Sequence, residues 1–175
     1  MTLFWLVAVV WASPEISVES ASLQLADGAS LSVQNATKDA EGVVGTGVQY
    51  ERGELVISAD STRWSLKDAR GVFEGNVTAT QAELRFYSQR VEVQLTDDGS
   101  IRTALATGGV EVQQAERVAK GMQARFANGR LVLTGNPSVR QAGSEMVGQE
   151  IVFVVGRETI ECKQCTMKVQ PVQHP

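Results

Sequence analysis

The sequence predicts an all-β fold in which antiparallel hairpins stack along one apolar face. Three observations predict it. A hairpin with an aromatic residue before the turn and an aliphatic residue after it occurs three times, at 48–57, 84–93 and 124–133. Strand-like segments separated by turn signals recur through the chain, as expected of a sandwich or roll. Glycines mark the ends of several of these segments. A two-stranded ribbon cannot bury an apolar face alone, so stacking the copies is the physical solution.

The copy at 124–133 gives the most definite register. Its two-residue Asn-Gly turn suits a type I′ hairpin, because both residues tolerate positive φ. This turn places Phe126 opposite Leu131, and Ala124 opposite Leu133. All four side chains then lie on one face of the hairpin, which we expect to be buried.

The other two copies predict the same arrangement. Applied to 48–57 and 84–93, the pairing gives four further cross-strand pairs: Tyr50–Leu55, Val48–Ile57, Phe86–Val91 and Leu84–Val93. The residues between them belong to the opposite face. Arg85, Arg125 and Val132 are therefore expected to point outward.

The remaining strands follow from turn residues and apolar runs. Asp27-Gly28 separates one strand pair, and the loop 97–99, ending in a glycine suited to a left-handed position, separates another. A nearly continuous apolar run predicts a strand near the carboxyl terminus. The segment 113–123 is the one plausible short helix, although it continues into strand alternation. The expected strands are 22–25, 31–33, 91–95, 101–105 and 151–155.

Glycine-containing steps form a second repeated pattern. They lie at Gly47, Gly75-Asn76, Gly108-Gly109 and Gly135-Asn136. Glycine and asparagine accept the positive φ values that bends, bulges and close backbone approaches require. Their matching contexts favour a repeated supersecondary unit.

Composition narrows the class of protein. The chain has 175 residues, 21% of them charged, four prolines and a formal net charge of −4. These values predict one folded domain, 13–175, long enough to bury a core. Positive residues are scattered singly, which argues against nucleic-acid binding.

The amino-terminal segment 1–12 reads as a secretory signal peptide. Leu3–Trp11 is apolar and is followed by a small-residue end before Ser13. It is too short for a bilayer span, which needs about 20 apolar residues. A buried first strand is the alternative, although nothing in the segment alternates with polar residues. We therefore predict export. The segment departs from the usual signal peptide in one respect, because no Lys or Arg precedes its apolar core.

Catalytic and metal chemistry has little support. The single histidine, His174, lies one residue from the carboxyl terminus, which disfavours histidine-based catalysis or metal binding. Asp97 and Asp98 form a carboxylate pair beside a glycine, a pattern typical of a hairpin turn. Asp60 and Glu74 are single carboxylates for which no pairing can be deduced. No cofactor is expected.

Cys162 and Cys165 form a Cys-x-x-Cys pair after a strand-like stretch. Two cysteines cannot build a zinc site without other ligands. A redox motif normally opens a helix, which the preceding residues do not predict. In an exported protein we interpret the pair as a local structural disulfide that closes a tight turn.

Three stretches resemble the OstA-like/LptA family of periplasmic lipopolysaccharide-transport proteins. They are the motifs at 69–77, 106–112 and 131–137, the last reading Leu-Val-Leu-Thr-Gly-Asn-Pro. Residues 55–60 and 145–151 look like the family's opening strand and following turn. The resemblance covers about residues 50–157, and 16–49 more loosely. The Cys-x-x-Cys pair lies outside the family pattern.

The resemblance implies a β-jellyroll, a partly open roll of antiparallel strands. It also implies a non-enzymatic periplasmic carrier whose interior holds the lipid A part of lipopolysaccharide. Partners would be other Lpt bridge components, joined by edge-strand pairing, with head-to-tail self-association as a further possibility. The lipid-binding groove expected on this basis is lined by Phe73, Val77, Leu84, Phe86, Met122, Phe126, Leu131, Leu133 and Phe153.

Three alternatives remain open. The extra amino-terminal hairpins could belong to an LptC-like, membrane-associated relative. The chain could instead be a structural β-roll of the envelope with a dry core, and lipid binding would separate this reading from the carrier. A carbohydrate-active enzyme would need a pair of clustered carboxylates in a cleft.

Overall fold

The computed structural model describes residues 16–24, 28–38, 40–65, 67–157 and 159–169. Within these ranges the chain forms fourteen strands that belong to a single antiparallel sheet. This confirms the all-β prediction. The strands are β1 (Ile16–Gln24), β2 (Ser30–Lys38), β3 (Val43–Arg52), β4 (Leu55–Ser65), β5 (Arg70–Gln81), β6 (Leu84–Leu95), β7 (Ile101–Gln114), β8 (Arg117–Ala127), β9 (Arg130–Thr134), β10 (Ser138–Gln141), β11 (Ser144–Val147), β12 (Glu150–Val154), β13 (Ile160–Lys163) and β14 (Thr166–Val169).

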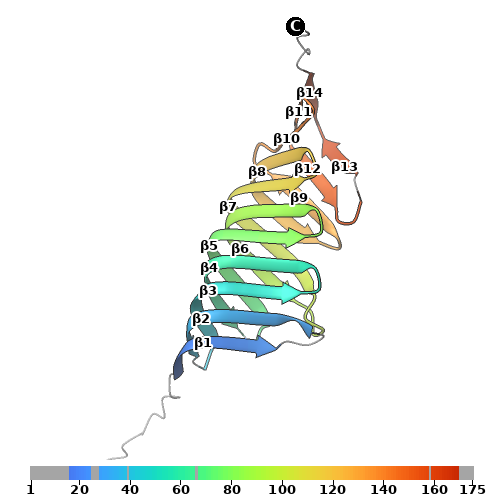
Figure 1. Ribbon diagram of the computed structural model, residues 1–175. Coiled ribbons are helices and arrows are strands. Elements are labelled where there is room, and N and C mark those ends of the chain that lie inside the picture. The colour runs from blue at the N-terminus through green and yellow to red at the C-terminus, as the bar shows by residue number, and fades with distance from the viewer. Residues whose placement is uncertain (1–15, 25–27, 39, 66, 158, 170–175) are drawn as a thin grey trace, which may run out of the picture.

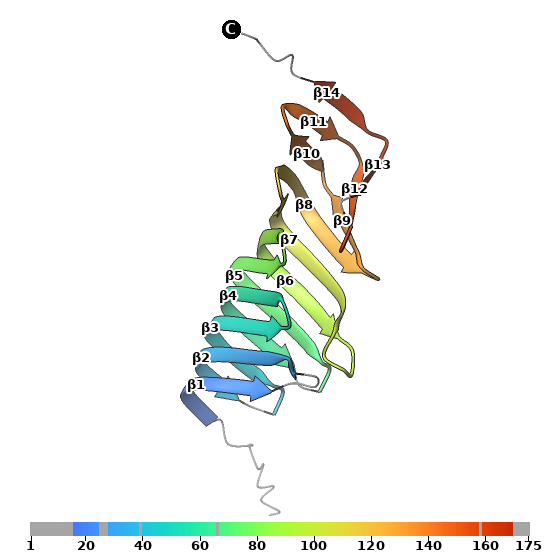
Figure 2. The same ribbon diagram turned by 45° about the vertical axis from the view of Figure 1, so that its right-hand side comes forward.

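The sheet is folded over along its length, so that the two halves of each long strand lie in two facing layers (Figures 1 and 2). We call these layers the limbs and the line of bends between them the spine. From β3 to β8 the first limb contains 48–52, 55–59, 77–81, 84–88, 110–114 and 117–120. The second limb contains 43–46, 61–65, 70–74, 90–95, 101–107 and 123–127. The hairpin turns lie at the outer ends of the limbs, opposite the spine.

After β8 the sheet divides at the spine. The first limb continues through β10, β11 and β14, and the second through β9, β12 and β13. The chain therefore keeps the same serpentine path, but each bend now separates two short strands. The two limbs end in separate edges, at β14 and β13, while β1 forms the edge at the other end of the roll.

The glycine-containing steps form the bends, as the sequence predicted. In β5 the register shifts between Glu74 and Val77, where Gly75 has φ 76° and Asn76 has φ 45°. In β7 the shift falls at Gly108 and Gly109, both with φ 86°. These are β-bulges, which bend a strand and reset its side-chain alternation. The positive φ values explain why these residue types stand there.

The predicted register is confirmed at the 124–133 hairpin, where Ala124 lies opposite Leu133 and Phe126 opposite Leu131. The structure contains the hairpin predicted at 48–57, but its register differs from the prediction by two residues. The turn is at 53–54, so Tyr50 lies opposite Ile57 and not opposite Leu55, and Val48 opposite Ala59. A shift of two residues keeps each side chain on its predicted face, whereas a shift of one would have reversed it.

The predicted hairpin at 84–93 is wrong. Residues 84–95 form one continuous strand, β6, which crosses the spine. Phe86 lies opposite Ala79 and Val112 instead of Val91, and Leu84 lies opposite Gln81 and Gln114 instead of Val93. The central Ser-Gln pair carries neither glycine nor asparagine, so it cannot readily supply the two positive φ angles of a type I′ turn. The strand bends there and continues.

The possible helix at 113–123 is also wrong. This segment contains the end of β7 and the start of β8, joined by the turn at Ala115 and Glu116. Ala115 has φ 51°. Strand alternation, with Val112 and Ala119 buried, overrides the helix propensity of the segment.

Three large aromatic side chains fill the interior near β3–β5. Tyr50 and Trp64 stack with ring centroids 6.5 Å apart, and Trp64 and Phe73 lie 6.3 Å apart in a tilted arrangement. All three side chains are buried. A Cβ atom on Gly71 would lie 2.1 Å from the Trp64 ring, so only glycine leaves room for the indole there. Each such aromatic side chain contributes about 1.5–3 kcal/mol by burial.

The outward face of the second limb is polar. Arg90 pairs with Glu74 and Glu92, and Glu92 also pairs with Arg70. Hydrogen bonds from Arg90 and then Arg70 hold the pKa of the Glu92 carboxyl below its usual range. The expected signal peptide, 1–12, lies outside the described residues. Within the described ranges no helix is long and apolar enough to cross a membrane.

Candidate functional site

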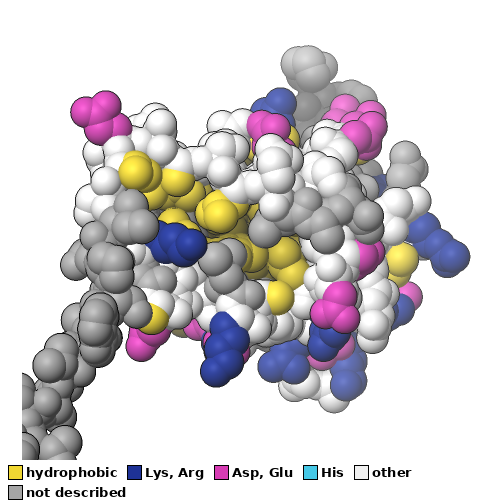
Figure 3. All heavy atoms as spheres, turned by 90° about the horizontal axis from the view of Figure 1, so that it is seen from below, with side chains coloured by type: hydrophobic (Ala, Val, Ile, Leu, Met, Phe, Trp, Pro, Cys, Tyr) yellow, Lys and Arg dark blue, Asp and Glu magenta, His cyan; other side chains and the backbone are white. Residues whose placement is uncertain are grey.

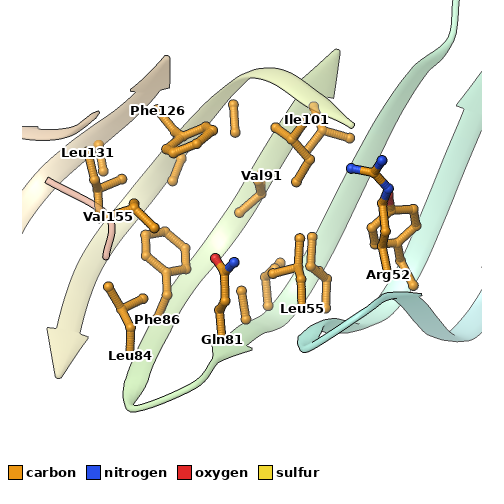
Figure 4. A pocket seen from close by; sticks show the side chains of 18 of the residues that line it. Arg52, Leu55, Gln81, Leu84, Phe86, Val91, Ile101, Phe126, Leu131 and Val155 are labelled. Carbon is orange, nitrogen blue, oxygen red and sulfur yellow. The ribbon is translucent and has the colours of Figure 1, made fainter. Parts of the chain in front are cut away.

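An apolar groove of about 300 Å³ lies between the two limbs. Figure 4 views it with the hairpin end of β5 and β6 on one side and strands of the second limb on the other. Its lining residues are Tyr50, Arg52, Leu55, Ile57, Val77, Ala79, Gln81, Leu84, Phe86, Val91, Val93, Ser100, Ile101, Ala104, Ala106, Ala124, Phe126, Leu131 and Val155.

Strand alternation directs these side chains inward. On the first limb Ile57, Ala79 and Phe86 project from neighbouring strands in matched register. On the second limb Ala104 and Phe126 lie opposite each other on β7 and β8. The bends reset the alternation at the spine, so both limbs present their apolar residues to the same interior.

Small side chains create the space. Four of the lining residues are alanines, three of them from β7 and β8 on the second limb. Larger side chains surround them: Phe86, Leu131 and Val155 gather at one end of the groove in Figure 4. The resulting surface is mainly apolar, which suits contact with an apolar chain.

The opposite end of the groove carries its polar contacts. The buried Tyr50 hydroxyl donates a hydrogen bond of 2.9 Å to the Gly99 carbonyl. Arg52 donates to the Ser100 hydroxyl, and to the carbonyl and carboxylate of Asp98 at 3.4 and 3.5 Å. These contacts join the β3–β4 hairpin of the first limb to the β6–β7 loop of the second.

The Tyr50 hydroxyl and the Asp98 carboxyl at this end each keep one protonation state near neutral pH. Burial raises the pKa of the Tyr50 hydroxyl, so it stays protonated and donates. Hydrogen bonds from the Thr96 hydroxyl, then the Ser100 hydroxyl and amide, lower the pKa of Asp98 from 3.8 to about 2. Asp98 is therefore a carboxylate that holds its own loop, in agreement with the turn predicted for Asp97 and Asp98.

The structure brings five of the nine predicted groove residues into the lining. These are Val77, Leu84, Phe86, Phe126 and Leu131. Phe73, Leu133 and Phe153 also belong to the core but are packed among other side chains and do not line the groove.

Met122 is placed differently from the expectation. Its side chain is 66% exposed, and it lies beside Gly135 at the spine. In β8 the buried positions are Ala119 and Ala124. They are five residues apart, and an odd spacing would put them on opposite faces of a regular strand, so the alternation changes between them. A simple period of two, extended through that bend, assigned Met122 to the wrong face.

Sequence reasoning missed most of the remaining lining residues. Leu55 and Ile57 had been placed on the buried face of the 48–57 hairpin, and the two-residue shift in register leaves them there. Val91 and Val93 were paired with the wrong partners, although they were correctly taken as inward-facing. Ala124 had been placed on the buried face through its pairing with Leu133. The other three lining alanines gave no signal, because a small apolar residue is equally compatible with either face of a strand.

No metal or catalytic centre stands out. Among the described residues no group of three or more His, Cys, Asp or Glu side chains lies close enough to hold a metal ion. Asp60 accepts a hydrogen bond of 2.8 Å from Asn76 at the spine. Glu74 pairs with Arg90 on the outer face. Both candidate acids lie outside the groove lining.

Cys162 and Cys165 form a disulfide, with Cα atoms 5.9 Å apart. It encloses the bend between β13 and β14, where Gln164 has φ 52°. A Cβ atom on Gly148, in the neighbouring bend between β11 and β12, would lie 2.4 Å from the Cys165 sulfur. The cystine thus packs at the spine in the last layer, where several other layers have glycine or asparagine.

Fold and groove together define an all-β, partly open jellyroll with an apolar interior. The family model described as "LptA/(LptD N-terminal domain) LPS transport protein" matches residues 56–159. The match covers more than half of the chain, so the protein belongs to this OstA-like, LptA family of lipopolysaccharide-transport proteins.

The chain is also similar to a solved structure, that of LptH, the LptA-homologous periplasmic component of the lipopolysaccharide transport device of Pseudomonas aeruginosa. The TM-score is 0.59 at 20% identity, with 67% of this chain and 95% of that chain covered. At this identity the likeness establishes the fold. No curated protein matches the chain.

Proposed function

We propose that the protein is a non-enzymatic periplasmic carrier that binds the lipid A part of lipopolysaccharide and passes it from the inner towards the outer membrane. The observation that carries the proposal is the groove between the limbs, lined on both sides by apolar side chains. Membership of the transport family supports the same role. Acyl chains are the part of lipopolysaccharide that such a surface would remove from water.

The groove suits part of a lipid. A volume of about 300 Å³ lies at the lower end of the range for small-molecule sites, about 300–1,000 Å³. We therefore propose that acyl chains enter it while the sugar headgroup stays outside. The outward-facing charged residues, such as Arg85 and Arg125, would then remain in water.

Edge strands supply the proposed route to partners. β1 and β14 lie at opposite ends of the sheet order, and each pairs with one neighbour among the described strands. Met167 and Val169 on β14 are 64% and 67% exposed. An unpaired edge can add a strand from another chain. We propose that another Lpt component, or a second copy, pairs at these edges to form a bridge.

Export is part of the proposal. The apolar segment at the amino terminus would be removed near Ser13, which releases the protein into the periplasm. Amino-terminal sequencing of protein from the envelope fraction tests this step. Retention of residues 1–12, with the protein held in the inner membrane, would favour the LptC-like alternative.

Photo-cross-linking in living cells tests the carrier function. A photoreactive residue in place of Phe86, which points into the groove, should capture lipopolysaccharide. The same residue in place of Arg85, the exposed next position on β6, should capture much less. Phe126 and Arg125 on β8 form a second matched pair. If the folded, exported protein captures no lipid at either inward position, the structural β-roll becomes the better account.

A further inference from the structure

The apolar interior extends beyond the end of the groove. Tyr50 lies at this end, and its neighbour in the β2–β3 register is Leu31, which is fully buried. Val33 is buried on the same strand, and Leu23 on β1 packs against the core. Seen from the β1 end, hydrophobic side chains gather in the middle of the molecule, with charged residues around them (Figure 3).

Tyr50 separates these two apolar regions. Its ring stacks on Trp64 of the second limb, and its hydroxyl reaches Gly99. The groove lining includes Tyr50, whereas Leu31 and Val33 on the next strand, β2, do not line it. Arg52, two residues after Tyr50 and on the same face of β3, also connects the two limbs, through its hydrogen bonds to Ser100 and Asp98.

We propose that Tyr50, Arg52 and the β6–β7 loop form a clasp between the limbs that sets how far an acyl chain extends along the roll. The inference rests on the proposed lipid-carrier function and adds specificity-determining residues to it. With the clasp closed, a chain occupies the groove from Leu55 to Val155. With the clasp open, the Tyr50 ring can leave its stacked position against Trp64, and the chain can advance towards the interior beside β1 and β2, which side chains such as Leu31 fill in the closed state.

The contacts of the clasp are suited to reversible opening. The Arg52 and Asp98 side chains are 29% and 52% exposed, so water can replace their ion pair at low cost. The loop keeps its own shape through hydrogen bonds between Thr96 and Ser100 and from the Gly99 amide to Thr96. It can therefore separate from the first limb as a unit, without unfolding the β6–β7 hairpin.

The test compares lipid capture on the two sides of the clasp in living cells. A photoreactive residue is placed at Leu84 in the groove, or at Leu23 beyond the clasp. In the otherwise unchanged protein, Leu84 should capture lipopolysaccharide and Leu23 little. Arg52→Ala should raise the ratio of capture at Leu23 to capture at Leu84 by about two- to fivefold, the factor expected for loss of a partly exposed ion pair.

Two further variants make the result specific. Tyr50→Phe removes the hydrogen bond to Gly99 but keeps the ring, and should raise the same ratio. Arg63→Ala, an exposed arginine on the outer face of β4, should leave it unchanged. Chemical denaturation establishes that each variant is folded.

Each outcome decides between the inferences. Equal capture at Leu23 and Leu84 in the parent protein, or an unchanged ratio in both Arg52→Ala and Tyr50→Phe, would overturn the clasp and leave the carrier function intact. Absence of capture at both positions would overturn the carrier function, and the clasp with it.

Discussion

Two neighbouring regions of this roll use the same bent strands for different interiors. Around β3–β5 the inward positions carry Tyr50, Trp64 and Phe73, which fill the space between the limbs. Around β7 and β8 they carry Ala104, Ala106 and Ala124, and a groove remains. The backbone pattern is the same in both regions. The size of the inward side chain therefore decides whether the roll is solid or hollow.

This comparison gives the largest expected difference in stability. Trp64→Ala should lower the free energy of unfolding by about 3–5 kcal/mol, because it leaves a cavity in the filled region. Leu84→Ala, at the partly exposed rim of the groove, should cost no more than about 1.5 kcal/mol. Chemical denaturation measures both values. Equal losses would mean that the groove region is packed as tightly as the filled region.

The second prediction concerns the two faces of β8. Phe126→Asp should cost about 2–4 kcal/mol of stability or lipid binding, since it places a charge in the apolar interior. Arg125→Asp, one residue away on the exposed face, should cost less than about 0.5 kcal/mol. Denaturation and lipid-binding assays of the two variants provide the comparison. Similar damage from both would contradict the facing described for this strand.

The third prediction concerns the disulfide, which lies between β13 and β14 in the last layer of the roll. Replacing Cys162 and Cys165 together by serine should cost about 2 kcal/mol or less, because the loop between them is short. Hydrogen exchange should become faster in β11–β14 and stay unchanged around Trp64. A reductant should reproduce this effect in the parent protein and have none in the variant. Faster exchange throughout the chain would show that the cystine supports the whole roll.

Local patterns predicted much of the fold. The Asn-Gly turn fixed the pairing of Phe126 with Leu131, because a two-residue type I′ turn permits one register. The Gly-Asn and Gly-Gly steps were correctly taken as bends or bulges. The aromatic-turn-aliphatic pattern misled at Ser88, where the chain bends at the spine instead of reversing. A bend and a hairpin turn both interrupt strand alternation. They differ in whether the segments before and after the interruption pair with each other, as in a hairpin, or with neighbouring strands, as the two halves of β6 do.

The candidate site was less predictable for a related reason. Phe86 and Leu131 were recognised because large apolar residues in strand alternation are expected to face inward. Met122 was misassigned because the alternation changes at Met122 itself, beside Gly121, a glycine without positive φ that was not recognised as part of a bend. The crossing contacts of Arg52 with Asp98 and Ser100 join residues far apart in sequence, and no local pattern indicates them.

We propose that the alanine-lined groove holds the acyl chains of the lipid. Ala104→Phe should fill the groove, whereas Thr103→Phe adds the same ring to the exposed, opposite face of β7. Mass spectrometry of protein purified from the native envelope measures the lipid that remains bound. We expect lipopolysaccharide to co-purify with the parent and Thr103→Phe proteins, and the amount bound to fall about tenfold, or 1.4 kcal/mol, with Ala104→Phe. Equal lipid in all three proteins, or none in the parent, would contradict this proposal.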